Sequence, residues 1–183
     1  MNNTKTNPIG LDAKIQSLQT RLFSQLNTLW GLTSLNELDA YGRCYVIEKD
    51  GEKTVRFFKT PSEYQIVSVP ERNKFFFLSR AIQKKTDTLR YETTIEAIFL
   101  LDVVSLKPDV THRADIEVQA DVELILNQID NIFVESIETG FENVLRGIKY
   151  EQSSDMQPYH AFKFNLNVVY NMTDYGWLDD KLD

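Results

Sequence analysis

The sequence predicts an α+β domain in which an antiparallel sheet carries two main helices packed on one face. Apolar residues recur at helical spacing in two segments, one beginning at Leu11 and one beginning at Val118. Other segments alternate apolar with polar residues, as strands with one wet face do. Because the expected strands follow one another in groups and do not alternate with helices, the pattern favours helices segregated from the sheet.

A chain of 183 residues with 42% hydrophobic content is long enough for one domain with a sizeable core. The first ten residues are polar, so we expect a flexible N-terminal arm over residues 1–10. We expect a single α+β domain over residues 11–171 and an acidic C-terminal tail over residues 172–183.

The first predicted helix begins near residue 11 and ends near Trp30 and Gly31. Asp12 lies in its first turn, where the positive end of the helix dipole favours an anion. The apolar face of this helix is formed by Leu11, Ile15, Leu18, Leu22, Leu26 and Leu29.

A group of strands is expected after this helix. Residues 41–58 predict a hairpin, because apolar and polar residues alternate on either side of the turn formers Asp50 and Gly51. Residues 64–69 suit another short strand. Residues 74–79 contain three adjacent phenylalanines, which cannot share one face, so this strand is either covered on both faces or partly buried by a partner.

The middle of the chain is expected to hold a loop, a central strand and the second main helix. Residues 80–91 are polar and basic without a clear period, which is typical of a loop. Residues 95–106 are apolar on both faces, which suits a central strand that Pro108 ends. The stripe of the second helix is formed by Val118, Val122, Ile125, Ile129 and Ile132.

The C-terminal third is expected to hold a short helix, a polar loop over residues 151–158 and a final strand. The short helix would contain Ile137, Phe141, Val144 and Leu145. The buried face of the final strand is predicted to be Phe162, Phe164, Leu166, Val168 and Tyr170. Its wet face is predicted to include Lys163, Asn165 and Asn167.

Charge is divided between two segments of the chain. Residues 115–142 contain eight acidic residues and no lysine or arginine, whereas residues 43–90 contain 11 basic and 6 acidic residues. A chain divided in this way can dock head-to-tail on copies of itself. The alternatives are a solvated basic loop, a solvated acidic helix face and a core position for the C-terminal tryptophan and leucine. The residues expected at a subunit interface are Arg80, Lys84, Lys85, Arg90, Asp121, Glu123, Trp177 and Leu178.

No motif predicts catalysis, a cofactor or a metal. His112 precedes several charged residues, but the only other histidine is His160, so a position at the start of a helix is expected for it. The seven glycines are too scattered to form a phosphate-binding loop. Cys44 is the only cysteine and suits a strand core. We therefore expect a protein that is not an enzyme and holds no cofactor.

Two bulk properties limit the kinds of partner that we expect for this protein. A pI near 4.9 disfavours a dedicated nucleic-acid binder. The longest apolar run, residues 97–101, is too short to span a bilayer, so no membrane partner is expected.

The order of elements in the second half of the chain resembles that of the tail terminator (tail completion) proteins of long-tailed bacteriophages, and of neighbouring neck proteins. Besides the N-terminal helix, the resemblance is carried by a long apolar strand over residues 94–104, a helix from Asp115, a short helix over residues 139–145 and the final strand over residues 160–170, so that it covers most of residues 11–171. It implies a virion protein without catalysis that forms a ring, often six-fold, on the tail tube. Such a ring joins the tube to the neck, touches other tail and neck proteins, and receives the filled head.

If a ring forms, acidic residues are expected to line a passage that DNA crosses without tight binding, because basic residues there would hold the duplex. The residues expected to face this lumen are Asp115, Glu117, Asp121 and Glu123. These carboxylates could instead solvate a helix or meet a basic neighbour. Other functions left open are a head–tail adaptor, a tail tube component, a small cytosolic enzyme with the acidic helix lining a pocket, and a module that binds peptides along the triple-phenylalanine strand.

Overall fold

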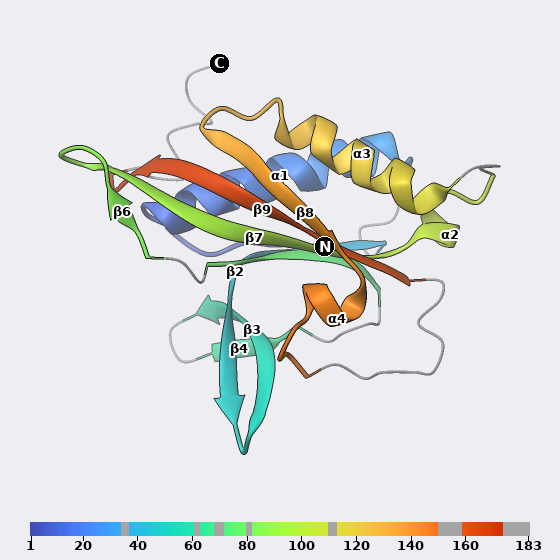
Figure 1. Cartoon of the computed structure of the whole chain (residues 1–183), viewed down its shortest axis with the longest axis horizontal. Helices are drawn as coiled ribbons and strands as arrows, with labels where there is room; N and C mark the ends of the chain where they lie inside the picture. Colours follow the sequence, from blue (N-terminus) through green and yellow to red (C-terminus); the bar gives the residue numbers. More distant parts are fainter. Residues whose placement is uncertain are drawn as a thin grey trace.

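The described part of the chain folds into one large, mostly antiparallel sheet with four helices, a mixed α/β arrangement (Figure 1). This computed structural model describes residues 1–33, 37–60, 63–67, 72–79, 82–109, 113–149 and 159–173. The predicted loop at residues 151–158 lies outside the described residues, as do Arg80, His112, Trp177 and Leu178.

The sheet has the strand order β4-β3-β2-β5-β7-β9-β8, with β1 beside β2 and β6 beside β7. The pairs β1–β2 and β2–β5 are parallel, whereas β2–β3, β5–β7, β7–β9 and β8–β9 are antiparallel. The strands are β1 Asn2–Asn3, β2 Leu38–Lys49, β3 Glu52–Thr60, β4 Glu63–Ile66, β5 Asn73–Leu78, β6 Lys84–Lys85, β7 Arg90–Asp102, β8 Ile132–Thr139 and β9 Tyr159–Asn171.

The helices are α1 Leu11–Leu29, α2 Val103–Leu106, α3 Ala114–Leu126 and α4 Phe141–Val144. The structure confirms the predicted N-terminal helix and the long central strand, although that strand ends four residues early. Its last residue, Asp102, caps α2 by accepting hydrogen bonds from the backbone N–H groups of Val104 and Ser105.

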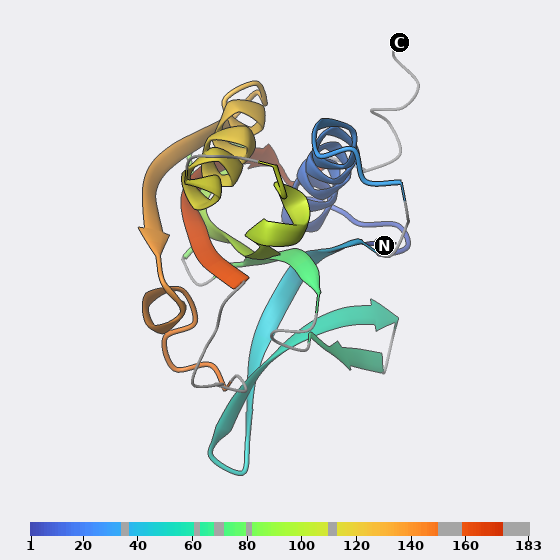
Figure 2. The ribbon, with the colours of Figure 1, turned by 90° about the vertical axis from the view of Figure 1, so that its right-hand side faces the viewer.

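Two apolar clusters form the core. The larger cluster joins α1 and α3 to inward side chains of β5, β7 and β9, and the smaller one joins the β2–β3 hairpin to α4 and the segment after it. Phe75 and Phe77 lie in the larger cluster and Phe76 in the smaller one, so β5 is covered on both faces. Figure 2 shows the β2–β3 hairpin extending away from α1 and α3. Because β5 has β2 on one side and β7 on the other, the triple-phenylalanine strand offers no edge for a peptide.

The predicted hairpin is confirmed with its turn. Asp50 and Gly51 have φ values of 55° and 79°, as a two-residue turn between twisted strands requires. Residues 84–85, predicted to lie in a loop, instead form β6 and pair with β7.

The predicted second helix is confirmed only as far as Leu126. Ile132 and Ile137, which the spacing assigned to helices, lie in β8 and pair with Val168 and Phe164 of β9. Asn131 has a φ of 62°, which breaks helical geometry just before β8 begins. The helical spacing of the isoleucines was therefore a coincidence, and pairing with a long neighbouring strand decides the structure here.

The buried face of β9 is confirmed, because all five predicted residues are buried. The prediction of a solvent-exposed face is wrong at Lys163, which is only 8% exposed. Its Nζ lies 3.2 Å from a carboxylate oxygen of Glu96 and 3.2 Å from one of Glu138. A lysine can be buried here because two neighbouring strands supply opposite charges.

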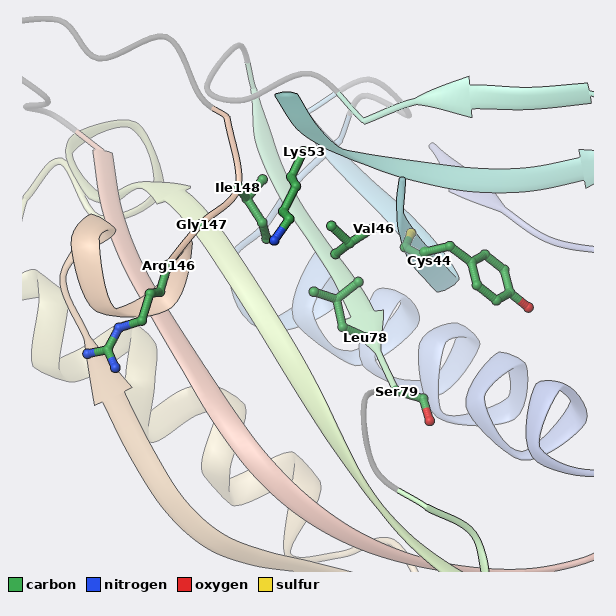
Figure 3. Close-up of a pocket in the computed structure, with 9 residues that line it drawn as sticks. Cys44, Val46, Lys53, Leu78, Ser79, Arg146, Gly147 and Ile148 are labelled. Carbon is green, nitrogen blue, oxygen red and sulfur yellow. The ribbon is translucent and has the colours of Figure 1, made fainter. Parts of the chain in front are cut away.

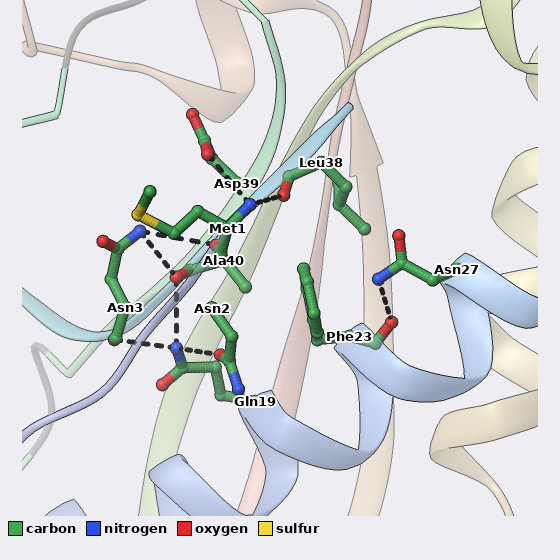
Figure 4. Close-up of polar contacts among 9 residues, drawn as sticks. All are labelled: Met1, Asn2, Asn3, Gln19, Phe23, Asn27, Leu38, Asp39 and Ala40. Carbon is green, nitrogen blue, oxygen red and sulfur yellow. Dashed lines mark hydrogen bonds and ion pairs between the residues drawn. The ribbon is translucent and has the colours of Figure 1, made fainter. Parts of the chain in front are cut away.

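The first residues are held against the domain, in place of the predicted flexible arm. Asn2 and Asn3 pair with β2. The fully buried Gln19 of α1 donates from Nε2 to Oδ1 of Asn2 at 2.7 Å and to the carbonyl of Asn3 at 2.8 Å (Figure 4). A third acceptor, the carbonyl of Ala40 in β2, lies 3.1 Å from the same nitrogen, so one side chain joins β1, α1 and β2.

Gly42→Ala should destabilise the protein by about 1–3 kcal/mol, because the new Cβ would lie 2.8 Å from Oε1 of Gln19. Urea unfolding measures the loss. In a Gln19→Ala background the same change should cost much less, since the clashing atom is gone. Equal losses in both backgrounds would contradict this packing.

Phe164→Ala should cost about 3–5 kcal/mol, because the ring is fully buried in the larger cluster. Phe133→Ala on the neighbouring strand is the matched control. Its ring is 59% exposed, so less than about 1 kcal/mol is expected. Comparable losses from the two variants in chemical denaturation would show that the facing of β8 and β9 is incorrect.

Candidate functional site

The helix α3 has apolar residues on two opposite sides. Its inner side chains, which include Val118 and Val122, are fully buried against the sheet and α1. On the outer side Ile116 is 54% exposed, Leu124 is 61% exposed and Ala120 is exposed between them. Residues four apart lie above one another on a helix, so these three form one line, called here the stripe. The side of a helix that faces away from the core normally carries polar residues, so an apolar line on that side is unusual.

Acidic residues flank the stripe, and several of them meet cations of the same chain. Lys107 Nζ lies 2.6 Å from Oε1 of Glu117 and 3.1 Å from Oδ2 of Asp121. The indole Nε1 of Trp30 also donates to Asp121, at 2.8 Å. These contacts tie α3 to the end of α1 and to the segment after α2.

On the other flank of the stripe, Arg113 donates to Asp115 at 2.5 Å. Hydrogen bonds from Arg113 hold the pKa of the Asp115 carboxyl below its ordinary value. Glu123 is half-buried on the same flank. Of the four carboxylates expected to face a lumen, the structure thus brings three into ion pairs within the chain.

His160 of β9 links the sheet to α3. Its Nε2 lies 2.7 Å from the amide nitrogen of Gln119, a geometry in which the amide donates to a neutral imidazole. Burial lowers the pKa of His160, and the nearby Asp115 offsets this only in part.

The His160 pair predicts a pH dependence of stability. The unfolded chain takes up a proton at this residue as the pH falls through about 6.5, whereas the folded chain resists protonation until lower pH. Stability should therefore fall as the pH drops below about 6.5, and less so in His160→Gln. Urea midpoints at about pH 7.5 and about pH 5.5 give the comparison. An equal fall in both proteins would mean that His160 is not held neutral.

A second surface feature is a basic hairpin, called here the arm, formed by residues 82–91. Lys84 and Lys85 of β6 pair with Glu92 and Tyr91 of β7, and the backbone N–H of Thr86 donates to the carbonyl of Arg90 at 2.9 Å. All residues from 82 to 90 are exposed. The structure thus brings together three of the basic residues that the sequence predicted for an interface, Lys84, Lys85 and Arg90.

The arm also carries exposed apolar residues that the sequence reasoning missed. Ile82 is 90% exposed and Leu89 is 50% exposed. The available signal was the presence of two aliphatic residues in an otherwise polar segment. Figure 1 shows the tip of the arm at one end of the longest axis and α3 toward the other end.

A cavity of about 360 Å³ lies where β2 separates from β5, beside the segment that follows α4. Val46 and Leu78 point into it, whereas Arg146 points away (Figure 3). Burial raises the pKa of the Cys44 thiol, so this cysteine is not an activated nucleophile. Among the described residues that line this cavity, none carries a carboxylate or an imidazole.

Within the residues that the structure describes, no three His, Cys, Asp or Glu side chains gather in a way that could hold a metal ion. None of the described helices is both long and apolar enough to cross a bilayer.

No protein-family model matches the chain, and no curated protein matches it. Two exposed surfaces of the described chain combine apolar side chains with flanking charges of opposite sign: the stripe and the arm.

Proposed function

We propose that the chain is a structural subunit that assembles with copies of itself into a ring at the head–tail junction of a long-tailed bacteriophage, in the manner of a tail terminator. The observation that carries this proposal is the stripe on α3. Exposed aliphatic residues aligned on an ordered helix mark a protein interaction surface. A helix without such a role would normally turn polar residues outward.

The surroundings of the stripe suit an interface. Val104 of the neighbouring α2 is also exposed, at 61%. The flanking carboxylates form a polar rim around it, as in stable protein interfaces. In the proposed subunit, α1 and α3 together form a helical layer on one face of the sheet, and α3 turns its outer side to the neighbour.

The bacteriophage assignment rests on the resemblance in the order of elements. The described order is long strand β7, helices α2 and α3, strand β8, short helix α4 and final strand β9, so α2 and β8 are two elements that the resemblance did not include. In this proposal the ring caps the tail tube, contacts neck proteins and lets DNA pass without tight binding, consistent with a net charge of −7. A head–tail adaptor or a tail tube component would use the same kind of self-assembling subunit.

The double variant Ile116→Glu and Leu124→Glu should reduce the protein to single chains, because two charges would be buried in each interface. Size-exclusion chromatography with light scattering measures the change in mass. The wild type should elute as a closed assembly that electron microscopy shows as a ring with a central opening.

Ile66→Glu is the matched control, because Ile66 is an isoleucine with 52% exposure in β4, at the edge of the sheet that is separated from β7 and the arm by three strands. It should leave the assembly intact. A wild type that remains a single chain at every concentration would contradict the proposed function, as would stripe variants that assemble like the wild type.

A further inference from the structure

The stripe needs a partner surface, and the arm of the same chain has complementary properties. The stripe has aliphatic side chains at its centre and carboxylates on its flanks. The arm has aliphatic side chains, Ile82 and Leu89, with basic side chains beside them. Each surface therefore offers what the other requires, both in apolar area and in the sign of its charge.

The charges of the two surfaces nearly balance. The arm carries Lys84, Lys85 and Arg90 against the single acid Asp87, a balance of +2. The helix α3 carries four carboxylates and no base. Among the described residues, Lys107 and Arg113 form ion pairs with three of these carboxylates from outside the helix, and counting these two cations gives a balance of −2. Surfaces of opposite charge steer one another into register, and like charges reject other pairings.

The arm is built to hold its side chains in place. Its two strands pair at the base, and the side-chain hydroxyl of Thr86 donates to the carbonyl of Arg90 at 3.2 Å. The backbone N–H of Met172 donates to the carbonyl of Leu89 at 2.9 Å, so the end of β9 supports the arm from the other side. A supported hairpin loses less conformational entropy on binding than a loose loop would.

The arm of a chain cannot contact the stripe of the same chain, because the two lie toward opposite ends of the long axis (Figure 1). The pairing has to occur between chains. Two different surfaces that meet head-to-tail give a ring when the rotation closes.

We propose that the arm of one copy lies on the stripe of the next copy, with Ile82 and Leu89 against the stripe and the basic residues of the arm against its acidic flanks. This inference rests on the proposed self-assembly and adds the identity of the partner surface. It also assigns Asp115 and Glu123, on one flank of the stripe, to the subunit contact and away from a DNA passage.

The test uses full-length variants that each lose one surface. The arm variant carries Lys84→Glu, Lys85→Glu and Leu89→Ser, and the stripe variant carries Ile116→Glu and Leu124→Glu. Each alone should give single chains of 21.3 kDa. Mixed in equal amounts, they should give pairs and nothing larger, because one intact arm and one intact stripe remain between them. Circular dichroism checks that each variant is folded.

A direct contact can be tested by crosslinking, because Cys44 is buried and the described residues contain no other thiol. A chain with Leu89→Cys mixed with a chain with Ala120→Cys should form a two-chain disulfide under mild oxidation. Replacing Leu89→Cys by Ile66→Cys, in β4 at the far edge of the sheet, should abolish it.

The outcomes separate the two proposals. If the stripe variant is a single chain but the arm variant assembles like the wild type, the arm is not the partner and self-assembly through α3 stands. If both variants are single chains but their mixture gives no pairs, and the two cysteine-bearing chains form no disulfide, the arm–stripe contact is wrong. If the wild type itself is a single chain, the proposed function fails first.

Discussion

The antiparallel pairing of β7 with β9 organises the larger core cluster and the sheet around it. The two strands are antiparallel along their full lengths, from Arg90 opposite Asn171 to Asp102 opposite Tyr159. Their inward rings stack, with the centroids of Phe99 and Phe162 5.0 Å apart. Four elements contact this pair of strands directly: α1 and α3 share a core cluster with it, and β5 and β8 pair with it on either side.

The same ribbon connects the two surfaces proposed to meet between copies. The arm includes the first residues of β7, and β6 pairs with β7 there. At the far end, His160 of β9 contacts Gln119 of α3, and Asp102 caps the helix that leads toward α3. Because one rigid pair of strands holds both ends, the distance and angle between arm and stripe are fixed within a subunit. A fixed angle between two complementary surfaces is what allows a ring to close with a defined number of copies.

Sequence patterns predicted the parts of the fold that depend on local periodicity. The leucine spacing of α1 and the alternation around Phe164 needed no knowledge of partners. Lys163 could not be predicted, because its two carboxylate partners come from strands distant in the sequence. The segment after Leu126 was misassigned, since isoleucines three residues apart fit a helix until β9 offers a strand to pair with.

The sequence predicted only part of the candidate interaction surfaces, for a related reason. The eight acidic residues of the 115–142 segment led to an interface predicted from charge alone. Ile116, Ala120 and Leu124 recur at helical spacing in the same sequence, so the line they form could have been found from it. Knowing that it faces outward required the position of the sheet. In the same way, the basic residues of the arm suggested an interface, but its exposed aliphatic residues became meaningful only once the hairpin was seen to project.

Native mass spectrometry of the purified chain measures self-assembly without assuming a shape, because it counts subunits. Assembly into a ring predicts one dominant species whose mass is a single whole-number multiple of 21.3 kDa and which dissociates as salt is raised, since the rim charges are screened over about 10 Å at 0.1 M salt. A spectrum containing only the single-chain mass across the accessible concentrations would contradict it.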